Sequence, residues 1–365
     1  MPSIDESEPT LELLYLGVVT EIDRRTLEAN GIPYRHVPAG KIRRYMSGVH
    51  LTFFDLLYLV PLGVLKALWT MFFVMPDVVF SKGGYGSVPV VFAAWVYRIP
   101  ILLHETDLVP GLSNRRLSRF ASAVAVSFRK VYTGFPEARK VFVAGTPLRA
   151  AFEALPDQAT ARRSLGLHDR KPVIFVTGGS QGAQRINTVV TTVIPRLILE
   201  AQILHQVGEN NFAAVTEFLS KDLRHFPGIE DYHVVGSLSE EDMAASLAAA
   251  DLIISRAGGT ALAEIAAAGK PAILIPLLEA AQDHQWENAY FFREQGASVV
   301  LDEANLTPAL FEATVRRILG NPQDLRLMGQ RVRTLHRAGA AGEIAEVLVA
   351  MTQGRVPRRV AEPTP

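Results

Sequence analysis

Short apolar runs alternate with amphipathic stretches along most of the chain, and this alternation predicts strands followed by helices. In the first half we expect helices at residues 21–30, 88–97 and 111–120, and strands at residues 11–18, 77–81, 100–104, 123–128 and 140–144. Gly31 ends the first of these helices, as glycine commonly does. Because the strands are apolar throughout, they are typical of a parallel sheet that helices cover on both faces.

The same pattern restarts in the second half of the chain. Residues 171–177 predict a strand, residues 183–199 a helix and residues 251–301 further strand and helix units. Between the halves, residues 145–149 break the pattern, which places a domain boundary near residue 148. We therefore expect an α/β protein with these parts: parallel-sheet domains at 1–147 and 148–325, C-terminal helices at 326–352 that could pack back on the first domain, and a disordered tail at 353–365.

One apolar segment, residues 49–80, raises the question of a membrane span. Four residues interrupt it: Asp55, Pro61, Lys66 and Pro76. No run of about 18 uncharged residues remains, so we expect no transmembrane helix. Residues 62–74 could still form a helix that is apolar on most faces, and four basic residues precede it: Arg35, Lys41, Arg43 and Arg44. Such a helix either lies buried in its own domain or rests on an anionic membrane surface.

Composition narrows the classes of partner. The 365 residues include 37 basic and 37 acidic side chains, so the formal net charge is zero. Without an overall positive field, we expect no nucleic-acid partner. The chain has no cysteine, which excludes a disulfide, a thiolate nucleophile and a cysteine-ligated metal. Its polar, acidic N-terminal residues are unlike a signal peptide.

The densest cluster of candidate ligand-binding residues lies at 255–289. Gly258 and Gly259 separate a predicted strand from a predicted helix. Amides at a helix N-terminus attract phosphate, and glycine lets a ligand approach the backbone closely. Glu264 follows within two turns, where its carboxylate could accept two sugar hydroxyls. Ligands of open parallel sheets lie beyond the carboxyl ends of strands, so the pattern predicts a nucleotide-sugar site, with an ordinary βαβ unit as the alternative.

Two more glycine loops follow predicted strands. Residues 178–182 (GGSQG) open a helix, which is the context of a phosphate cradle, although they match neither a Walker loop nor a GxGxxG motif. Residues 82–86 (KGGYG) occupy the equivalent place in the first half, with Lys82 supplying charge and Tyr85 a ring or hydroxyl. Arg149, at the domain boundary, could pair with phosphate. Plain connections and a surface arginine are the alternatives.

Residues 104–107 (HETD) follow an apolar strand. His104, Glu105 and Asp107 are therefore expected to face the crevice between the domains, as an acid/base or acceptor-binding cluster. The alternative is a capping network for the helix that follows. His284 either joins the site or caps its own helix.

Six motifs together closely resemble the MurG family, the UDP-N-acetylglucosamine:undecaprenyl-pyrophosphoryl-muramoyl-pentapeptide N-acetylglucosaminyltransferases of glycosyltransferase family 28. They are GGSQGAQRIN (178–187), SRAGG with AEIAAAGKPAILIP (255–259 and 263–276), DHQWENA (283–289), KGGYGSVP (82–89), HETDLVPGLSNRRLSRFA (104–121) and GTPLR (145–149). The match runs from about residue 11 to residue 350.

The resemblance implies a GT-B architecture, with two Rossmann-like domains around a cleft. It implies inverting transfer of N-acetylglucosamine from UDP-GlcNAc to the muramoyl 4-hydroxyl of lipid I (undecaprenyl-pyrophosphoryl-MurNAc-pentapeptide), giving lipid II for peptidoglycan. Neither a cofactor nor a metal is implied. The implied location is the bacterial cytoplasm, at the anionic surface of the inner face of the plasma membrane.

The resemblance also implies site residues, carried over by position. Glu264 would bind the uridine ribose hydroxyls, Leu238 would lie beside the uracil and Gln285 would bind the GlcNAc hydroxyls. The remaining donor-binding residues are Arg149, Gly178, Gly179, Ser180, Gln181, Gly259, Thr260, Ala261, Leu262 and Ala263. The acceptor-binding residues are Lys82, Gly83, Gly84, Tyr85 and Asp107.

The sequence departs from the family pattern in two places. Nothing in it corresponds to the opening strand and GGTGGH loop, whose histidine is a proposed general base. A misassigned start or a separately encoded segment would explain this. We then expect an unpaired edge in the first sheet and poor transfer or none, with His104 and Glu105 as candidate bases if transfer occurs. Second, Asp107 stands where the family has a neutral asparagine, and a carboxylate repels phosphate unless it is paired or protonated.

Two rival functions remain open. One is a GT-B glycosyltransferase that acts on another lipid acceptor, which competition between UDP-GlcNAc and UDP-glucose would separate. The other is a non-catalytic UDP-sugar-binding protein, which UDP binding without turnover would favour.

Overall fold

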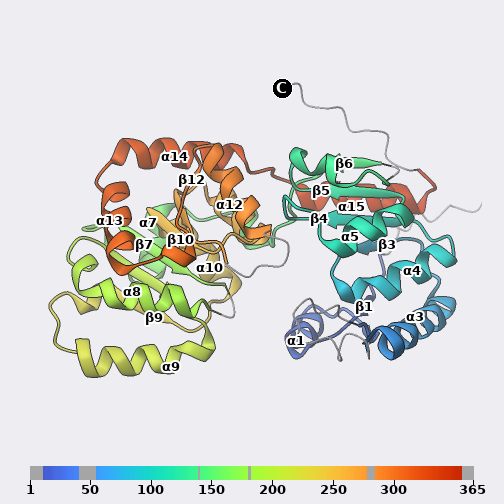
Figure 1. The fold of residues 1–365 in the computed structure, drawn as a ribbon, viewed down its shortest axis with the longest axis horizontal. Coiled ribbons are helices and arrows are strands. Elements are labelled where there is room, and N and C mark those ends of the chain that lie inside the picture. The colour runs from blue at the N-terminus through green and yellow to red at the C-terminus, as the bar shows by residue number, and fades with distance from the viewer. Residues whose placement is uncertain (1–10, 41–54, 139, 180–181, 278–283, 356–365) are drawn as a thin grey trace, which may run out of the picture.

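The computed structural model describes residues 11–40, 55–138, 140–179, 182–277 and 284–355. These residues form two α/β domains that lie side by side (Figure 1). Each domain is built on parallel strands with helices packed against them. The expected α/β class with two parallel-sheet domains is confirmed.

The first domain contains two separate parallel sheets. The larger has the order β3-β4-β5-β6, with strands Val79–Ser81, Ile101–Glu105, Ala123–Val126 and Val141–Val143. Among the described strands, β1 (Tyr15–Gly17) and β2 (Tyr34–His36) pair only with each other. The α-helices of the first domain are α1 (Glu21–Ala29), α3 (Val60–Val74), α4 (Val88–Val96) and α5 (Leu112–Leu117).

The second domain has one six-stranded parallel sheet of order β12-β11-β10-β7-β8-β9. Its strands are β7 (Val173–Thr177), β8 (Gln202–Gln206), β9 (Tyr232–Val235), β10 (Leu252–Ser255), β11 (Ala272–Leu274) and β12 (Ser298–Val300). Its helices are α7 (Gln158–Ser164), α8 (Gln184–Leu197), α9 (Glu209–Phe218), α10 (Glu240–Ala249), α11 (Gly259–Ala268), α12 (His284–Glu294), α13 (Pro308–Leu319) and α14 (Pro322–Thr334). The strand order reverses between β7 and β10, and such a switch point is where doubly wound sheets bind ligands.

Strand β7 shows why these strands are apolar throughout. Ile174 and Val176 point to one face of the sheet, where they pack with α8 and α13. Phe175 points to the other face and packs with α11 and α12. Because helices cover both faces, every residue of the strand is buried. The apolar runs in the sequence therefore predicted a doubly covered sheet correctly.

The chain passes between the domains twice. After the first sheet it enters α6 (Ala150–Glu153), whose Phe152 is buried in the core of the second domain. After α14 it returns to α15 (Ala340–Thr352), whose Ile344 and Val347 pack on the first sheet (Figure 1). The two passages touch, since a Cβ added at Gly145 would lie 3.0 Å from Cβ of Arg337.

The apolar segment differs from the sequence prediction in its continuity. A π-helical turn at Asp55–Leu59 runs directly into α3, and Pro61 lies in the first turn of α3, where its fixed φ suits the helix. The resulting helical stretch Leu57–Val74 has 18 residues and is apolar enough to cross a membrane by length and composition alone. The helix is therefore continuous through Pro61 and Lys66, although the charge of Lys66 still leaves no uncharged run of about 18 residues within it. One face of α3 packs against α4, through Gly63, Ala67 and Met71.

Candidate functional site

Two glycine turns lie next to each other at the switch point of the second sheet. Strands β7 and β10 are neighbours, and Thr177 pairs with Ser255 at their carboxyl ends. Gly178 follows β7 in a turn so tight that an added Cβ would lie 2.4 Å from the amide nitrogen of Ala183. Gly258 follows β10, and an added Cβ there would meet nothing within 4 Å. The predicted phosphate loops are thus brought together, although Ser180 and Gln181 lie outside the described residues.

Helix α11 begins at Gly259 and presents backbone amides at this edge of the sheet. It has no side-chain N-cap, and the first amide bonded within the helix is that of Leu262, which donates to Gly258 O at 3.0 Å. The amides of Thr260 and Ala261 precede it and have no acceptor in the helix, which makes the helix start suited to an anion. Leu262 and Ala263 were also predicted to bind the donor. Their side chains are buried in the core, so only their backbone can contribute to the site.

Arg149 and Glu264, both predicted donor-binding residues, form an ion pair. Nη2 of Arg149 donates to Oε1 of Glu264 at 3.1 Å, and the side chains are 53% and 13% exposed. The guanidinium carbon of Arg149 also lies 4.8 Å from the ring centre of Phe152. Burial raises the pKa of Glu264. The positive charge of Arg149 opposes this rise, and the negative charge of Glu240 adds to it. A largely buried carboxylate next to an exposed guanidinium can accept hydroxyl hydrogens while the guanidinium turns to an anion.

Asp107 links the first domain to the start of α11. Its Oδ1 accepts hydrogen bonds from the amide of Gly259 at 3.1 Å and from Nδ2 of Asn288 at 2.8 Å. Asn288 also donates to Ala257 O and accepts from the amide of Leu108. The carboxylate is thus paired with N–H donors of the second domain. We expected Asp107 beside the acceptor loop, and we did not single out Asn288, although it belongs to the DHQWENA motif.

His104 and Glu105 lie within β4 and not beyond its end. His104 is fully buried, its Nε2 bonds to Gly145 O at 2.8 Å, and burial lowers its pKa to about 4. Glu105 is also buried and accepts from Nδ2 of Asn114 and the amides of Asp107 and Gly111. The prediction that both face the other domain is therefore wrong. Strand β4 ends one residue later than expected, at Glu105, and the hydrogen bond from the Gly111 amide before α5 supports the capping interpretation for Glu105.

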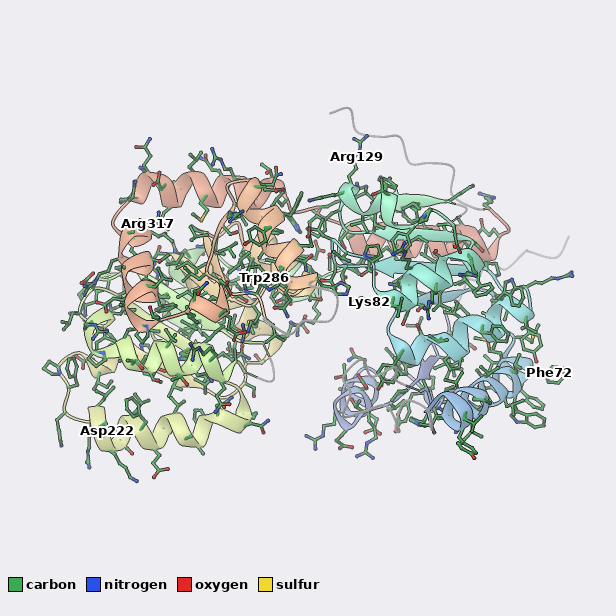
Figure 2. The ribbon with its side chains drawn as sticks, in the orientation of Figure 1. Phe72, Lys82, Arg129, Asp222, Trp286 and Arg317 are labelled. Atoms are coloured by element: carbon green, nitrogen blue, oxygen red, sulfur yellow. The ribbon has the colours of Figure 1, made fainter. Side chains whose placement is uncertain are left out.

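The Lys82 loop lies on the side of the first domain that faces the second (Figure 2). Gly83 and Gly84 have φ of +86° and +84°, which glycine adopts readily. An added Cβ at Gly83 would lie 2.5 Å from Oδ1 of Asn114, so the loop packs directly on the residue that holds Glu105. Lys82 and Tyr85 are exposed. Their predicted role toward an acceptor stays a prediction.

The remaining predicted residues lie around the start of α12 and the loop before α10. Oε1 of Gln285 accepts from the amide of Leu277 at 3.0 Å, which joins α12 to the segment after β11. Leu238 is partly buried against the core that contains α11. Nδ1 of His284 lies 4.0 Å from Oδ2 of Asp107. Trp286, on the same helix, is labelled in Figure 2.

Two parallel-sheet α/β domains, the second with an open helix start at its switch point, form the GT-B architecture that many glycosyltransferases share. Residues 3–126 match the glycosyltransferase family 28 N-terminal domain, and residues 173–344 match the glycosyltransferase family 28 C-terminal domain. The chain therefore belongs to glycosyltransferase family 28.

Similar proteins agree with this membership. A Bacillus cereus protein named UDP-N-acetylglucosamine–N-acetylmuramyl-(pentapeptide) pyrophosphoryl-undecaprenol N-acetylglucosamine transferase 2 is 37% identical over 82% of this chain and 81% of its own length. A transferase with the same name, without the final numeral, from Legionella pneumophila is 31% identical over 95% of this chain and 91% of its own. The crystal structure of Acinetobacter baumannii MurG superposes with a TM-score of 0.71 at 27% identity, covering 93% of this chain and 91% of that one.

Proposed function

We propose that this chain transfers N-acetylglucosamine from UDP-GlcNAc to the muramoyl 4-hydroxyl of lipid I, which forms lipid II. The names of its relatives support this reaction. The observation that carries the proposal is the placement of the Arg149–Glu264 pair beside the free amides of α11, at the switch point of the second sheet. A nucleoside diphosphate needs these two features together: an acceptor for sugar hydroxyls and donors for phosphate oxygens.

The donor half of the site follows from these contacts. Glu264 accepts hydrogen bonds from the ribose hydroxyls, and its buried position strengthens them because little water competes. The diphosphate lies at the start of α11, where the Thr260 and Ala261 amides and Arg149 donate to its oxygens. Gly258 leaves the backbone open to close approach, whereas Gly178 permits the tight turn beside it.

The transfer step places charge on the diphosphate. The acceptor hydroxyl oxygen bonds to C1 of the sugar as the bond from C1 to the diphosphate oxygen breaks, and the hydroxyl proton passes to solvent. UDP departs with added negative charge, which the fixed amides of α11 and the guanidinium of Arg149 stabilise. These groups are in place before the reaction, so they need no reorganisation as the charge develops.

An exposed apolar surface on α3 supports a membrane location for this reaction. Trp69 is 69% exposed and Phe72 60% exposed, and residues three or four positions apart continue the row: Leu57, Tyr58, Leu62, Leu65 and Phe73. Figure 2 shows Phe72 on the side of the first domain turned away from the second domain. A helix with one face packed on its domain and the other apolar and exposed is suited to lie in a membrane surface, where a lipid-linked acceptor is found.

The proposal is tested by incubating the chain with UDP-GlcNAc and a lipid I analogue and measuring the disaccharide product. A parallel calorimetric titration with UDP separates binding from transfer. Product formation that UDP-glucose does not support is the expected result. UDP binding without product would favour the non-catalytic alternative, and the absence of UDP binding would overturn the donor site itself.

A further inference from the structure

A surface cavity outside the donor site lies beside an edge strand of the second sheet. A cavity of about 220 Å³ lies between α13, α14 and the edge strand β12. Its polar lining consists of Ser298, Arg317, Asp324 and Arg331. Ser298 is the first residue of β12, so the cavity lies at the amino end of that strand, whereas the donor site lies at carboxyl ends. Figure 2 shows Arg317 on the side of the second domain away from the first.

Two guanidinium groups line this cavity without a counter-charge bound to them. Arg317 and Arg331 form no ion pair or side-chain hydrogen bond within the described part of the chain. Arg316, the neighbour of Arg317, contrasts with them, because it pairs with Glu312 at 2.9 Å and Glu200 at 3.0 Å. Both side chains are exposed, so each is free to turn to an anion in the cavity.

The position of Arg331 depends on a glycine. Gly296, in the turn before β12, has φ of +64°, and an added Cβ would lie 2.2 Å from Nη1 of Arg331. Any larger residue at this position would displace the guanidinium. The turn therefore both requires glycine and leaves room for the arginine head group against the backbone.

Ser298 supplies an unused hydroxyl at the same place. The residue is only 5% exposed, and its buried Oγ has no hydrogen-bond partner among the residues that the structure describes. Buried hydroxyls are nearly always bonded, and Ser298 lines the cavity, so its side chain can turn to bond a ligand oxygen there. The amide of Ser298 also faces outward. Successive amides along a strand point to alternate sides, and the Leu301 amide bonds inward to Leu274 O. The Ser298 amide, three residues earlier, therefore points to the open edge of β12.

The remaining lining sets the shape and charge of the ligand. Val299, Ile318, Leu327 and Met328 provide an apolar wall. Asp324 brings one negative charge, and its carboxylate accepts from Nδ2 of Asn321 in the cap of α14. Two guanidiniums against one carboxylate leave the cavity net positive. An anionic group with a small apolar substituent satisfies all of these features.

We propose that this cavity binds a small phosphate monoester, with the phosphate held by Arg317, Arg331 and Ser298 and the carbon part against the apolar wall. The guanidinium fork matches phosphate oxygens, and the Ser298 hydroxyl donates to one of them. The site is separate from the donor site and does not depend on the function proposed above.

The probes for this site are phenyl phosphate and inorganic phosphate, titrated calorimetrically into the intact chain with UDP present to occupy the donor site. We expect phenyl phosphate to bind more tightly than inorganic phosphate, because only the former uses the apolar wall. Arg317→Ala and Arg331→Ala should each weaken binding about tenfold or more, since a charge-assisted hydrogen bond is lost. Arg316→Ala is the matched control on the same helix and should leave binding unchanged.

Ser298→Ala separates a ligand role from a structural one. Because the hydroxyl has no partner in the described protein, its removal should leave the melting temperature unchanged or raise it, while it weakens phenyl phosphate binding. No binding by the unaltered chain would overturn the proposal, as would an equal loss in Arg316→Ala. Unchanged binding in both arginine variants would overturn it as well.

Discussion

The carboxylate of Asp107, in the first domain, accepts a hydrogen bond from the backbone amide of Gly259, in the second domain, at 3.1 Å. Gly259 is the first residue of α11, so the carboxylate lies where the helix favours an anion. A phosphate that approaches the start of α11 therefore meets a negative charge already in place. Since Asn288 donates to the same oxygen, the carboxylate is held there by two bonds.

Asp107→Asn should strengthen UDP binding. The amide oxygen of asparagine can still accept from Gly259 and Asn288, so the contact between the domains is kept while the charge is removed. Repulsion between unit charges at contact distance in water-like surroundings is about 1 kcal/mol, or about fivefold in the dissociation constant. Calorimetry with UDP at low and high salt measures this effect.

Asp107→Ala serves as the comparison, because it removes the charge and the hydrogen bonds together. If both variants bind UDP as the unaltered chain does, the carboxylate does not face the donor phosphate. If Asp107→Asn binds UDP more tightly and Asp107→Ala does not, the contact between the domains itself contributes to UDP binding.

Glu264→Ala should weaken UDP binding by about 1.5–3 kcal/mol, or about ten- to a hundredfold, because a buried carboxylate that accepts ribose hydroxyls is lost. The dissociation constant for UDP, measured by calorimetry, checks this. Uracil or a nucleotide without ribose hydroxyls should show a much smaller difference between the two proteins.

Glu153→Ala is a suitable control for Glu264→Ala. Glu153 lies on α6, the same short helix that carries Phe152, and it is exposed. An equal loss of affinity in both variants would point to general electrostatics and not to a specific contact of Glu264.

Trp69→Ser and Phe72→Ser should reduce sedimentation with vesicles that contain phosphatidylglycerol. Burying a large apolar side chain contributes about 1.5 kcal/mol or more, so each change should lower the partition coefficient about tenfold. Leu199→Ser is the matched control, since Leu199 is equally exposed but lies on the second domain. An equal loss of vesicle binding in Leu199→Ser would contradict a membrane role for α3. Unchanged vesicle binding in all three variants would contradict it as well.

Acid should destabilise the second domain through His205. Its Nδ1 and Nε2 bond to Tyr232 and Asn187, and burial lowers its pKa to about 3. Above the unfolded pKa of about 6.5, neither state is protonated and the residue has no effect. Below it, only the unfolded chain binds the proton, so the free energy of unfolding falls, by roughly 2 kcal/mol at about pH 5.

The measurement for His205 is chemical denaturation at about pH 7.5 and about pH 5. Trp286 fluorescence reports on the second domain when Trp69 and Trp95 are replaced by phenylalanine. His205→Gln should lose less stability between the two pH values than the unaltered chain. Parallel losses in both proteins would remove His205 as the source of the pH dependence.

The pattern of apolar runs predicted the two sheets well, because strands such as β7 are covered on both faces and are apolar up to their last residue, Thr177. The donor site was also predictable in outline. Glycine turns that follow strands have a local signature, and parallel strands bring Gly178 and Gly258 to one edge whatever the rest of the fold does.

Contacts that depend on how the two domains meet could not be predicted. Asp107 and Asn288 are 181 residues apart, and no local pattern links them. The role of Glu105 depended on where β4 ends. We expected the strand to end at residue 104, but it includes Glu105, which is a buried capping group. Arg317 and Arg331 read as ordinary surface charges until α13 and α14 are packed against β12.

The contact between Gly145 and Arg337 bears on how the two domains can move. A single connecting segment would let the domains rotate in any direction, whereas two connecting segments that touch define a hinge axis. Rotation of one domain about the line through the two segments is then the easiest motion, because sliding or twisting of the domains requires one segment to stretch. Opening and closing around a ligand should therefore follow one arc, with the Asp107 contact at the side that separates.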